Sequence, residues 1–348
     1  MGTASDEVTL AIEGHAFHGF ETFSFERSLD TVSSFSFEAP FEPGNADHRE
    51  TFRPFTFKAL EVAIGDEPVL TGTMVDVLPE YSPDRKAVSV SGYGKPGVLE
   101  CPLPASAFPL EFKGLKLDSI ARAIAAHFGI EVVFEADVGA KFDKAALEPG
   151  DAPQGFLIDL AKQRGLVFSD DAFGRLRFWK SVDAGSPVAS LEGGWEPLVR
   201  VVPEFAPQSY FSEITAIAGA RRGRGGSKFT VKNPWLTTSV RPHSFDVDDT
   251  DPADAPTAAA AKLGRMFGEV AAYSIEELPT WRDPSGKLWT PNTTIVVSCP
   301  GVMIYEPTEF VIRSVMLEAS AERKIATLRL ALPGCYSGKV PTTLPWLG

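Results

Sequence analysis

The residues from Gly92 to Gly97 are spaced as in the glycine fingerprint that binds dinucleotides. That chemistry requires a helix to begin at the motif, so that its N-terminus meets the pyrophosphate. Pro96 interrupts the motif, and Cys101-Pro102-Leu103-Pro104 follows it in place of a helix. The sequence therefore favours a turn at the end of a strand, and no cofactor is expected.

Two groups of residues have the types that bind metal ions. His15 and His18 lie three residues apart, but a strand and turn would not place both rings on one face, and no cysteine or carboxylate has ligand spacing nearby. The second group resembles a calcium loop, but it lacks the glycine at the sixth position, and Thr257 stands where the bidentate glutamate would be. A solvated acidic loop before a helix is favoured, and no metal site is expected. The remaining residues of these groups are His48, Asp246, Asp248, Asp249, Asp251 and Asp254.

The sequence does not contain the common catalytic motifs. Neither a G-x-S-x-G elbow nor an H-E-x-x-H pair occurs, and Gly334 to Lys339 is one residue too short for a phosphate-binding loop. Paired carboxylates stay open as an alternative, because their spacing is spatial rather than sequential. The chain is expected not to be an enzyme, and no catalytic residue is assigned.

One segment concentrates positive charge. Its basic residues are Arg221, Arg222, Arg224 and Lys228, within a glycine-rich run. Three interpretations are open: contact with nucleic acid, docking on an acidic protein, or a hairpin tip kept soluble by charge. The segment lacks the interleaved aromatic side chains that stack on bases. We treat it as a candidate partner-contact loop.

Composition narrows the class of protein. The net charge of −13 over 348 residues disfavours binding to nucleic acid or to anionic membranes. The three cysteines, Cys101, Cys299 and Cys335, form no C-x-x-C pair, which fits a reducing compartment. No secretory signal and no apolar run of about 18 residues is present, so a soluble cytoplasmic product is expected. The 25 phenylalanines have no polar atom to satisfy, so they suit thin cores between sheets or subunit contacts.

The pattern of residues predicts three regions. Residues 1–98 alternate in period two between turns, which favours a small antiparallel barrel or sandwich, and we assign them to a first β-barrel domain. Residues 99–182 predict an α/β region with a duplicated helix–strand unit, because residues 116–134 and 152–170 align with a shift of 36 positions. In each copy a glycine, Gly129 or Gly165, follows the apolar helical positions. A β-hairpin is expected around Asp170–Gly174, which apolar runs flank on both sides. Residues 183–348 predict a second β-barrel with an inserted helix near 258–270.

Four collinear stretches carry a resemblance to a known family. They are residues 25–37, residues 70–77 with 88–92, residues 147–151 with 160–165, and residues 286–292 followed by the strands to Pro333. On these stretches the chain resembles the Mu-type baseplate hub proteins of contractile phage tails, also called the P protein or late control protein D-like tail protein family. The segment after Val88 departs from the family pattern, because Tyr93-Gly94-Lys95 stands where the family has Arg-Asp.

The resemblance implies a fold and a function. The fold would be α+β, mainly β, with two barrels similar to the tail-tube fold and the α/β part inserted between them. The function would be that of a structural hub in the virion baseplate, assembled in the host bacterial cytoplasm. It would form a homotrimeric ring that adapts the sixfold tail tube to the threefold spike, with a lumen for DNA passage. Its partners would be itself, the central spike protein, the tail tube protein, baseplate wedge proteins and the tape measure protein. A membrane or a specific nucleic-acid sequence is not expected as a partner.

Two other functions compete with this interpretation. A glycan-binding module of a phage or bacterial surface structure would also be rich in β-strands, and it would expose aromatic side chains on one sheet face. A cell-wall hydrolase would use the carboxylate pair left open above. Titration with soluble glycans and clearing of peptidoglycan in a gel would distinguish these alternatives from a hub.

Overall fold

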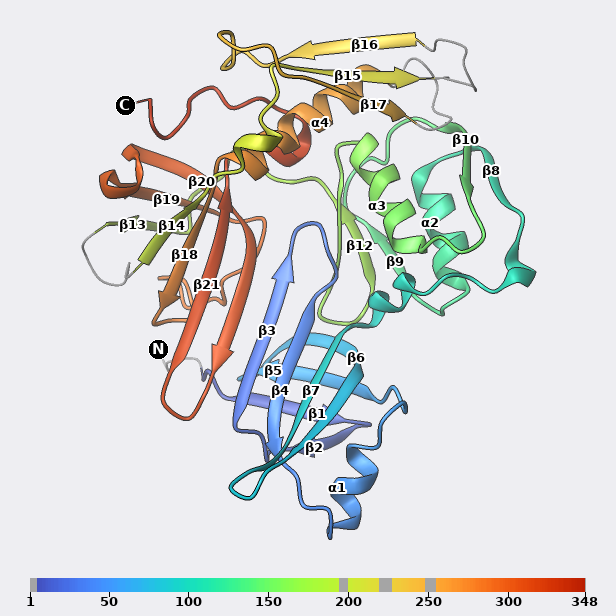
Figure 1. Ribbon diagram of the computed structural model, residues 1–348, viewed down its shortest axis with the longest axis vertical. Helices are drawn as coiled ribbons and strands as arrows, with labels where there is room; N and C mark the ends of the chain where they lie inside the picture. The colour runs from blue at the N-terminus through green and yellow to red at the C-terminus, as the bar shows by residue number, and fades with distance from the viewer. Residues whose placement is uncertain (1–4, 194–199, 219–226, 248–254, 348) are drawn as a thin grey trace.

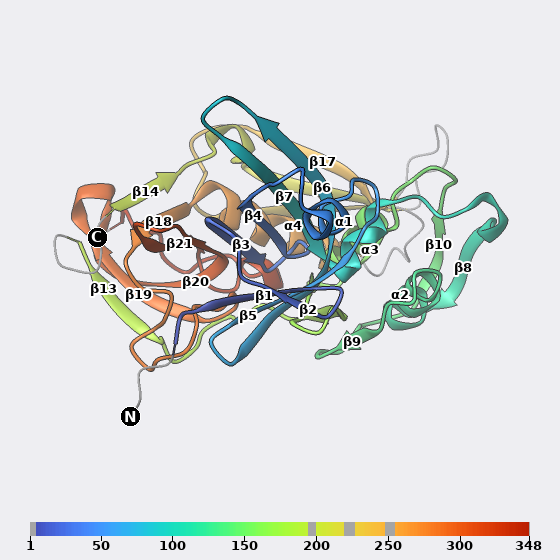
Figure 2. The same ribbon diagram turned by 90° about the horizontal axis from the view of Figure 1, so that it is seen from below.

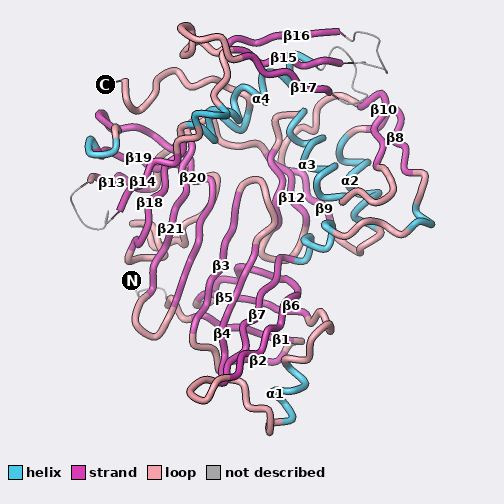
Figure 3. The backbone as a smooth tube through the Cα atoms, viewed as in Figure 1, coloured by secondary structure: helices cyan, strands magenta, loops and turns pink. Residues whose placement is uncertain are grey.

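The structure is a computed structural model that describes residues 5–193, 200–218, 227–247 and 255–347 (Figure 1). Strands contain more residues than helices do, and the longer helices lie in the α/β region and at α4 (Figure 3). A mainly β fold is therefore confirmed. None of the helices within the described ranges is both long enough and apolar enough to cross a membrane.

The first β region is built by side chains that alternate between core and solvent. In β4, Ser34–Pro40, Phe35, Phe37 and Ala39 are buried while Ser34 and Ser36 are exposed, so one face of the strand can pack on a core. The short helix α1, Ala46–Thr51, begins at Asn45, whose side chain accepts hydrogen bonds from the amides of Asp47 and His48. The other strands are β1 Val8–Ile12, β2 His15–Phe17, β3 Thr22–Ser28, β5 Ala59–Ile64, β6 Glu67–Tyr81 and β7 Lys86–Gly94.

The second β region joins the first in one 13-stranded sheet. The connection is an antiparallel pair between β3 and β20, Ile304–Ala319, in which Ser28 lies opposite Ser314 and Phe23 opposite Ala319. The buried residues of both regions form one hydrophobic core cluster. The remaining strands of the second region are β13 Ala189–Glu192, β14 Arg200–Glu204, β18 Ala272–Leu278, β19 Thr294–Cys299 and β21 Lys324–Ala331.

The expected pair of closed barrels is not found among the described residues. The sheet runs as an open path from β14 to β2, and neither region closes on itself through strand pairing. The two regions do not close separately because β3 of the first region pairs with β20 of the second, so these edges are not available for closure within one region. Local alternation specifies which residues are buried, but it does not specify which edge a strand pairs with.

The two β regions repeat the same connectivity. In the first region the strands are ordered β3-β4-β7-β6-β5, and in the second β14-β18-β21-β20-β19, with every neighbouring pair antiparallel. The long strands β6 and β20 are equivalent in this scheme. Each is interrupted by a register shift at the same place, between Met74 and Asp76 in β6 and between Ile312 and Ser314 in β20. The second region is thus a topological copy of the first.

The α/β region has a hydrophobic core cluster of its own. Helix α2, Leu117–Ala126, precedes strand β9, Val132–Phe134, and helix α3, Pro153–Gln163, precedes strand β11, Val167–Asp170. Gly129 and Gly165 follow the two helices with φ of +63° and +65°, which glycine adopts without a side-chain clash. Strand β11 forms the expected hairpin with β12, Leu176–Trp179. The other elements are η1 Lys95–Glu100, η2 Ala105–Ala107, β8 Leu110–Leu115 and β10 Phe142–Leu147.

A small sheet and a long helix are inserted between β14 and β18. The sheet has the order β16-β15-β17 and lies against α4, Ala255–Val270, at the top of Figure 1. Alanines of α4 face this sheet and form a third core cluster with it. Because their side chains are small, the helix can approach the sheet closely. The strands are β15 Glu213–Ala218, β16 Ser227–Lys232 and β17 Pro242–Val247; short 3-10 turns are η3 Pro207–Ser209, η5 Pro300–Val302 and η6 Cys335–Ser337.

Candidate functional site

Of the basic residues in the candidate partner-contact loop, the structure describes Lys228 alone. Arg221, Arg222 and Arg224 fall outside the described residues. Lys228 is exposed on β16, opposite Ile217 of β15. Strand β16 pairs with β15 alone among the described strands, and most of its residues are exposed. The structure therefore places Lys228 on a free sheet edge and leaves its role as a partner contact a prediction.

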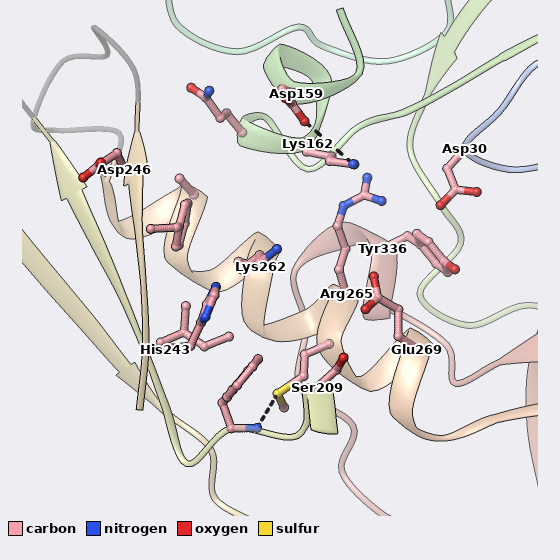
Figure 4. A pocket seen from close by; sticks show the side chains of 16 residues that line it. Asp30, Asp159, Lys162, Ser209, His243, Asp246, Lys262, Arg265, Glu269 and Tyr336 are labelled. Atoms are coloured by element: carbon pink, nitrogen blue, oxygen red, sulfur yellow. Dashed lines mark hydrogen bonds and ion pairs between the residues drawn. The ribbon is translucent and has the colours of Figure 1, made fainter. Parts of the chain in front are cut away.

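A pocket of about 470 Å³ lies beneath this sheet (Figure 4). The inserted sheet, α4 and α3 line it, and Asp30 reaches it from the loop after β3. Its charged side chains are of both signs, so it has no dominant potential for a charged ligand. Those labelled in Figure 4 are Asp30, Asp159, Lys162, Asp246, Lys262, Arg265 and Glu269.

Arg265 ties α4 to the α/β region at the back of this pocket. Its Nη2 donates a hydrogen bond of 2.7 Å to the carbonyl oxygen of Leu166, and its guanidinium lies 5.2 Å from the ring of Tyr336. The side chain is buried, and burial lowers the pKa of Arg265 while Asp30 opposes that shift. Burial also raises the pKa of the Tyr336 hydroxyl. A buried guanidinium held by a backbone oxygen and an aromatic ring fixes two parts of the chain together.

The pocket does not assemble a catalytic group. Its histidine, His243, stacks on Phe211 with ring centroids 4.6 Å apart, and burial and then Lys262 lower its pKa. The nearest thiol, Cys335, is buried, and burial raises its pKa so that the reactive thiolate is disfavoured. Within the described ranges, no three His, Cys, Asp or Glu side chains are grouped as metal ligands. The arrangement fits a structural joint better than a reaction site.

A second buried joint connects the first β region with the α/β region. Asp170 Oδ1 accepts hydrogen bonds from the amide of Ser33 at 2.8 Å and from its hydroxyl at 2.7 Å. Arg27 lies nearby and donates to Ser33 Oγ and to the carbonyl oxygen of Val69. Burial raises the pKa of Asp170, and the Arg27 charge opposes that shift. Ser33 of the first β region thus satisfies one oxygen of the buried Asp170 carboxylate of the α/β region.

The glycines of the fingerprint lie at this contact between the first β region and the α/β region. Gly92 and Gly94 end strand β7, and a 3-10 helix follows in place of the α-helix that a dinucleotide site requires. A Cβ atom on Gly94 would lie 1.9 Å from Asp170 Oδ2, and one on Gly92 would lie 2.0 Å from the carbonyl oxygen of Thr73. The glycines therefore allow close packing of strands and of the α/β region.

The other candidate ligands are not brought together. His15 and His18 are exposed near β2, while His48 lies on α1, where its Nδ1 accepts a hydrogen bond from the amide of Glu42. Asp246 is exposed on β17. The other aspartates of the acidic loop, Asp248, Asp249, Asp251 and Asp254, lie outside the described residues.

Two of the unpaired edges in the 13-stranded sheet belong to β6 and β14. Beyond Met74, β6 pairs with β7 on one side only among the described strands, and the hairpin that the two strands form projects from the molecule (Figure 2). At one end of the sheet, β14 pairs with β18 alone among the described strands. Unpaired edges expose backbone donors and acceptors that can pair with another chain. These edges are the candidate assembly surfaces of the molecule.

The comparisons with known proteins define the class. Residues 101–180 match the family model described as the second domain of gp44-like baseplate hub proteins. The chain is thus similar to baseplate hub proteins of phage tails. In particular, it is 24% identical over 328 residues to the baseplate hub protein gp44 of Escherichia phage Mu, covering 90% of this chain and 84% of that protein. The resemblance that the sequence indicates is thereby confirmed.

Solved structures agree on the fold. The 43 kDa tail protein of prophage MuSo2 from Shewanella oneidensis has a TM-score of 0.77 and 26% identity, covering 94% of this chain and 99% of that one. A tail protein from Neisseria meningitidis has the same TM-score of 0.77 at 22% identity, covering 95% of this chain and 97% of that one. The likeness extends over nearly the whole chain, so it includes both β regions and the α/β part.

Sequence reasoning missed the side chains that hold the regions together. Arg27, Asp170 and Arg265 were not singled out, although each is a charged residue within an otherwise buried segment. For Arg265 a signal exists, because Leu263, Met266 and Phe267 surround it on the helix. A charge within an apolar helical run indicates a buried contact, but the partner could not be named without the fold.

Proposed function

We propose that this chain is the structural baseplate hub of a phage or phage-like tail, acting as a homotrimeric ring. The observation that carries the proposal is the repeated connectivity of the two β regions. Three chains with two equivalent regions each would present six similar units around one axis, and at the same time three identical subunits. Such a ring would match a sixfold tail tube on one side and a threefold spike on the other. The likeness to the Mu hub protein supports this function.

The proposal includes a division of labour along the chain. Residues 1–98 and 183–348 would be the two ring-forming domains, and residues 99–182 would be an α/β domain built on a duplicated helix–strand unit. The partners would be the central spike, the tail tube, the baseplate wedge and the tape measure proteins, all within the virion. Its role would be assembly rather than catalysis, which fits the mixed-charge pocket and the protonated Cys335 thiol described above.

The acidic composition would serve the same function. A net charge of −13 would let DNA pass through a central lumen without adhering to its wall. Replacing lumen-facing carboxylates with amides should then slow DNA ejection or make it incomplete. Unchanged ejection would contradict this part of the proposal.

Light scattering of the purified protein during size-exclusion chromatography tests the hub assembly. The proposal expects a species of three times the 37.6 kDa chain mass at high protein concentration. If the chain is monomeric alone, the run is repeated with the spike protein of the same phage. A chain that stays monomeric in both runs would contradict the proposal.

A further inference from the structure

The repeated connectivity assigns the positions of five strands in one β region to positions in the other. The register shifts in β6 and β20 fix the alignment, because Asp76 and Ser314 each follow directly after one. From these residues the pairing partners can be read across each sheet. The two equivalent rows are Asp76–Ser91–Ser36–Ser24 in the first region and Ser314–Arg329–Ser274–Val202 in the second.

The row of the second region extends across the β20–β3 pair into the first region. Ser314 lies opposite Ser28, and the pairing runs along β20 to Ala319 opposite Phe23. The junction is closed, since Phe25 is 4% exposed and Leu317 opposite it is 1% exposed. Pairing with β3 therefore buries this stretch of β20.

In the first region the same row ends in solvent. The residues of β6 equivalent to 314–319 of β20 are 76–81, and no described strand lies on that side of them. Leu78 is 64% exposed and Tyr81 is 78% exposed. The strand equivalent to β3 is β14, whose outer edge is also open, and Phe205 just beyond it is 42% exposed. Each chain thus carries both halves of a second junction, at separate places on its sheet.

We propose that residues 76–81 of β6 pair antiparallel with β14 of a neighbouring copy of this chain, in the register of the internal β3–β20 junction. That register places Leu78 opposite Glu204 of the neighbouring copy and Glu80 opposite Val202 of the neighbouring copy. The inference rests on the proposed function and names its subunit interface. Because each chain offers one edge of each kind, the contact is head-to-tail and closes into a ring when the rotation permits.

The side chains at the two edges suit this contact. On the face that corresponds to the buried face of the internal junction, both strands carry apolar residues, so the contact would remove apolar surface from water. Pro79 and Pro203 fall opposite each other and supply no backbone donor, which limits the ladder to the flanking pairs and discourages pairing with other chains. The apolar residues are Val77, Pro79 and Tyr81 on β6, and Val201, Pro203 and Phe205 on and after β14.

Disulfide trapping in the full-length chain tests the register. Leu78→Cys and Glu204→Cys are introduced together, in a background where the exposed Cys101 is replaced by serine. Directly opposed residues of antiparallel strands have Cα atoms about 4.5–5.5 Å apart, within reach of a disulfide. After mild oxidation we expect covalent dimers and trimers on a non-reducing gel, at least tenfold above the level given by Leu78→Cys alone.

Two matched pairs serve as controls. Glu26→Cys with Met316→Cys occupies the equivalent position in the internal junction and should close within one chain, without a change of mass. Leu78→Cys with Arg200→Cys is displaced by four residues, roughly 13 Å along the strand, and should not close between chains.

The outcomes separate this inference from the proposed function. Trimers by light scattering without a Leu78–Glu204 cross-link, while the internal pair closes, would overturn the register and leave the hub assembly standing. Monomers by light scattering at every concentration, with and without the spike protein, would overturn both. Trimers in which only the displaced pair closes would also overturn the register.

Discussion

The internal junction between β3 and β20 and the open edges of β6 and β14 occupy equivalent positions in the two β regions, but their surroundings differ. At the junction, phenylalanine and leucine side chains are buried between strands of the same chain. At the open edges the equivalent positions hold prolines, Pro203 and Pro79, beside exposed apolar residues. Equivalent strand edges can therefore serve two purposes. The edges of β3 and β20 pair within the chain and contribute to folding, whereas the equivalent edges of β14 and β6 are unpaired and available for assembly.

Truncation at the closed junction should have the largest effect. Phe25→Ala removes a buried ring from the β3–β20 contact, and we expect the free energy of unfolding to fall by about 3–5 kcal/mol. The matched variant at the open edge, Tyr81→Ala, should change it by less than about 0.5 kcal/mol, because that side chain is exposed. Urea denaturation of both variants under monomeric conditions measures the difference. Equal losses would show that the two positions are not distinguished as described.

A charge at the open edge should weaken assembly and spare the fold. Tyr81→Glu places a carboxylate among the apolar residues of the proposed contact, so we expect the dissociation constant of the ring to rise about 100-fold, or about 2.7 kcal/mol. Val240→Glu changes an equally exposed apolar residue outside that edge and serves as the control. Sedimentation velocity over a concentration series gives both constants. A Tyr81→Glu protein that assembles as tightly as the control would argue against the β6 edge as an interface.

The last strand of the first β region, β7, differs from its equivalent β21 in the second region at the point where the α/β region follows. Strand β7 ends on Gly94, which leaves room for the Asp170 carboxylate, while the equivalent position after β21 is Leu332. Gly94→Ala should therefore destabilise the protein by about 1–3 kcal/mol through overpacking. Thermal unfolding would detect the change, and Gly44→Ala, where a Cβ meets no atom within 4 Å, is the control. Equal melting temperatures for the two variants would refute the close approach.

The inserted sheet distinguishes the second β region from the first, because it separates β14 from β18 in the chain whereas a short loop joins β3 and β4. His243 lies on strand β17 of this sheet. Burial and the neighbouring Lys262 lower the pKa of His243 in the folded protein, so the unfolded chain binds the proton more readily. Stability should therefore fall slightly on acidification through the ordinary histidine range, because the side chain is only partly buried. His243→Gln should reduce this dependence in urea titrations between about pH 7 and pH 5. His15→Gln, at an exposed residue, should leave it unchanged.

Local patterns predicted individual elements well. The helix expected near 258–270 is α4, Ala255–Val270, and the hairpin expected around Asp170–Gly174 is β11–β12. The glycines at 129 and 165 adopt the left-handed conformation that their positions after helices indicate. These features depend on residues close together in the sequence, so their signals are local.

Long-range pairing could not be predicted in the same way. The alternation in β3 shows which side chains are buried, but it carries no information that the strand pairs with β20 near the other end of the chain. For the same reason the sequence predicted two separate barrels where the structure has one continuous sheet. The contacts of Asp170 with Ser33 and of Arg265 with Leu166 also join distant segments, so their partners could be found only in the folded chain.

Electron microscopy of the assembled protein tests the central claim most directly. Class averages of the peak fraction, viewed down the axis, should show an open ring with six similar lobes, two from each of three chains. The lobes should alternate in outline, because only the second β region carries the inserted sheet. A compact particle without a central opening, or a ring whose number of lobes is not twice its number of chains, would contradict the account.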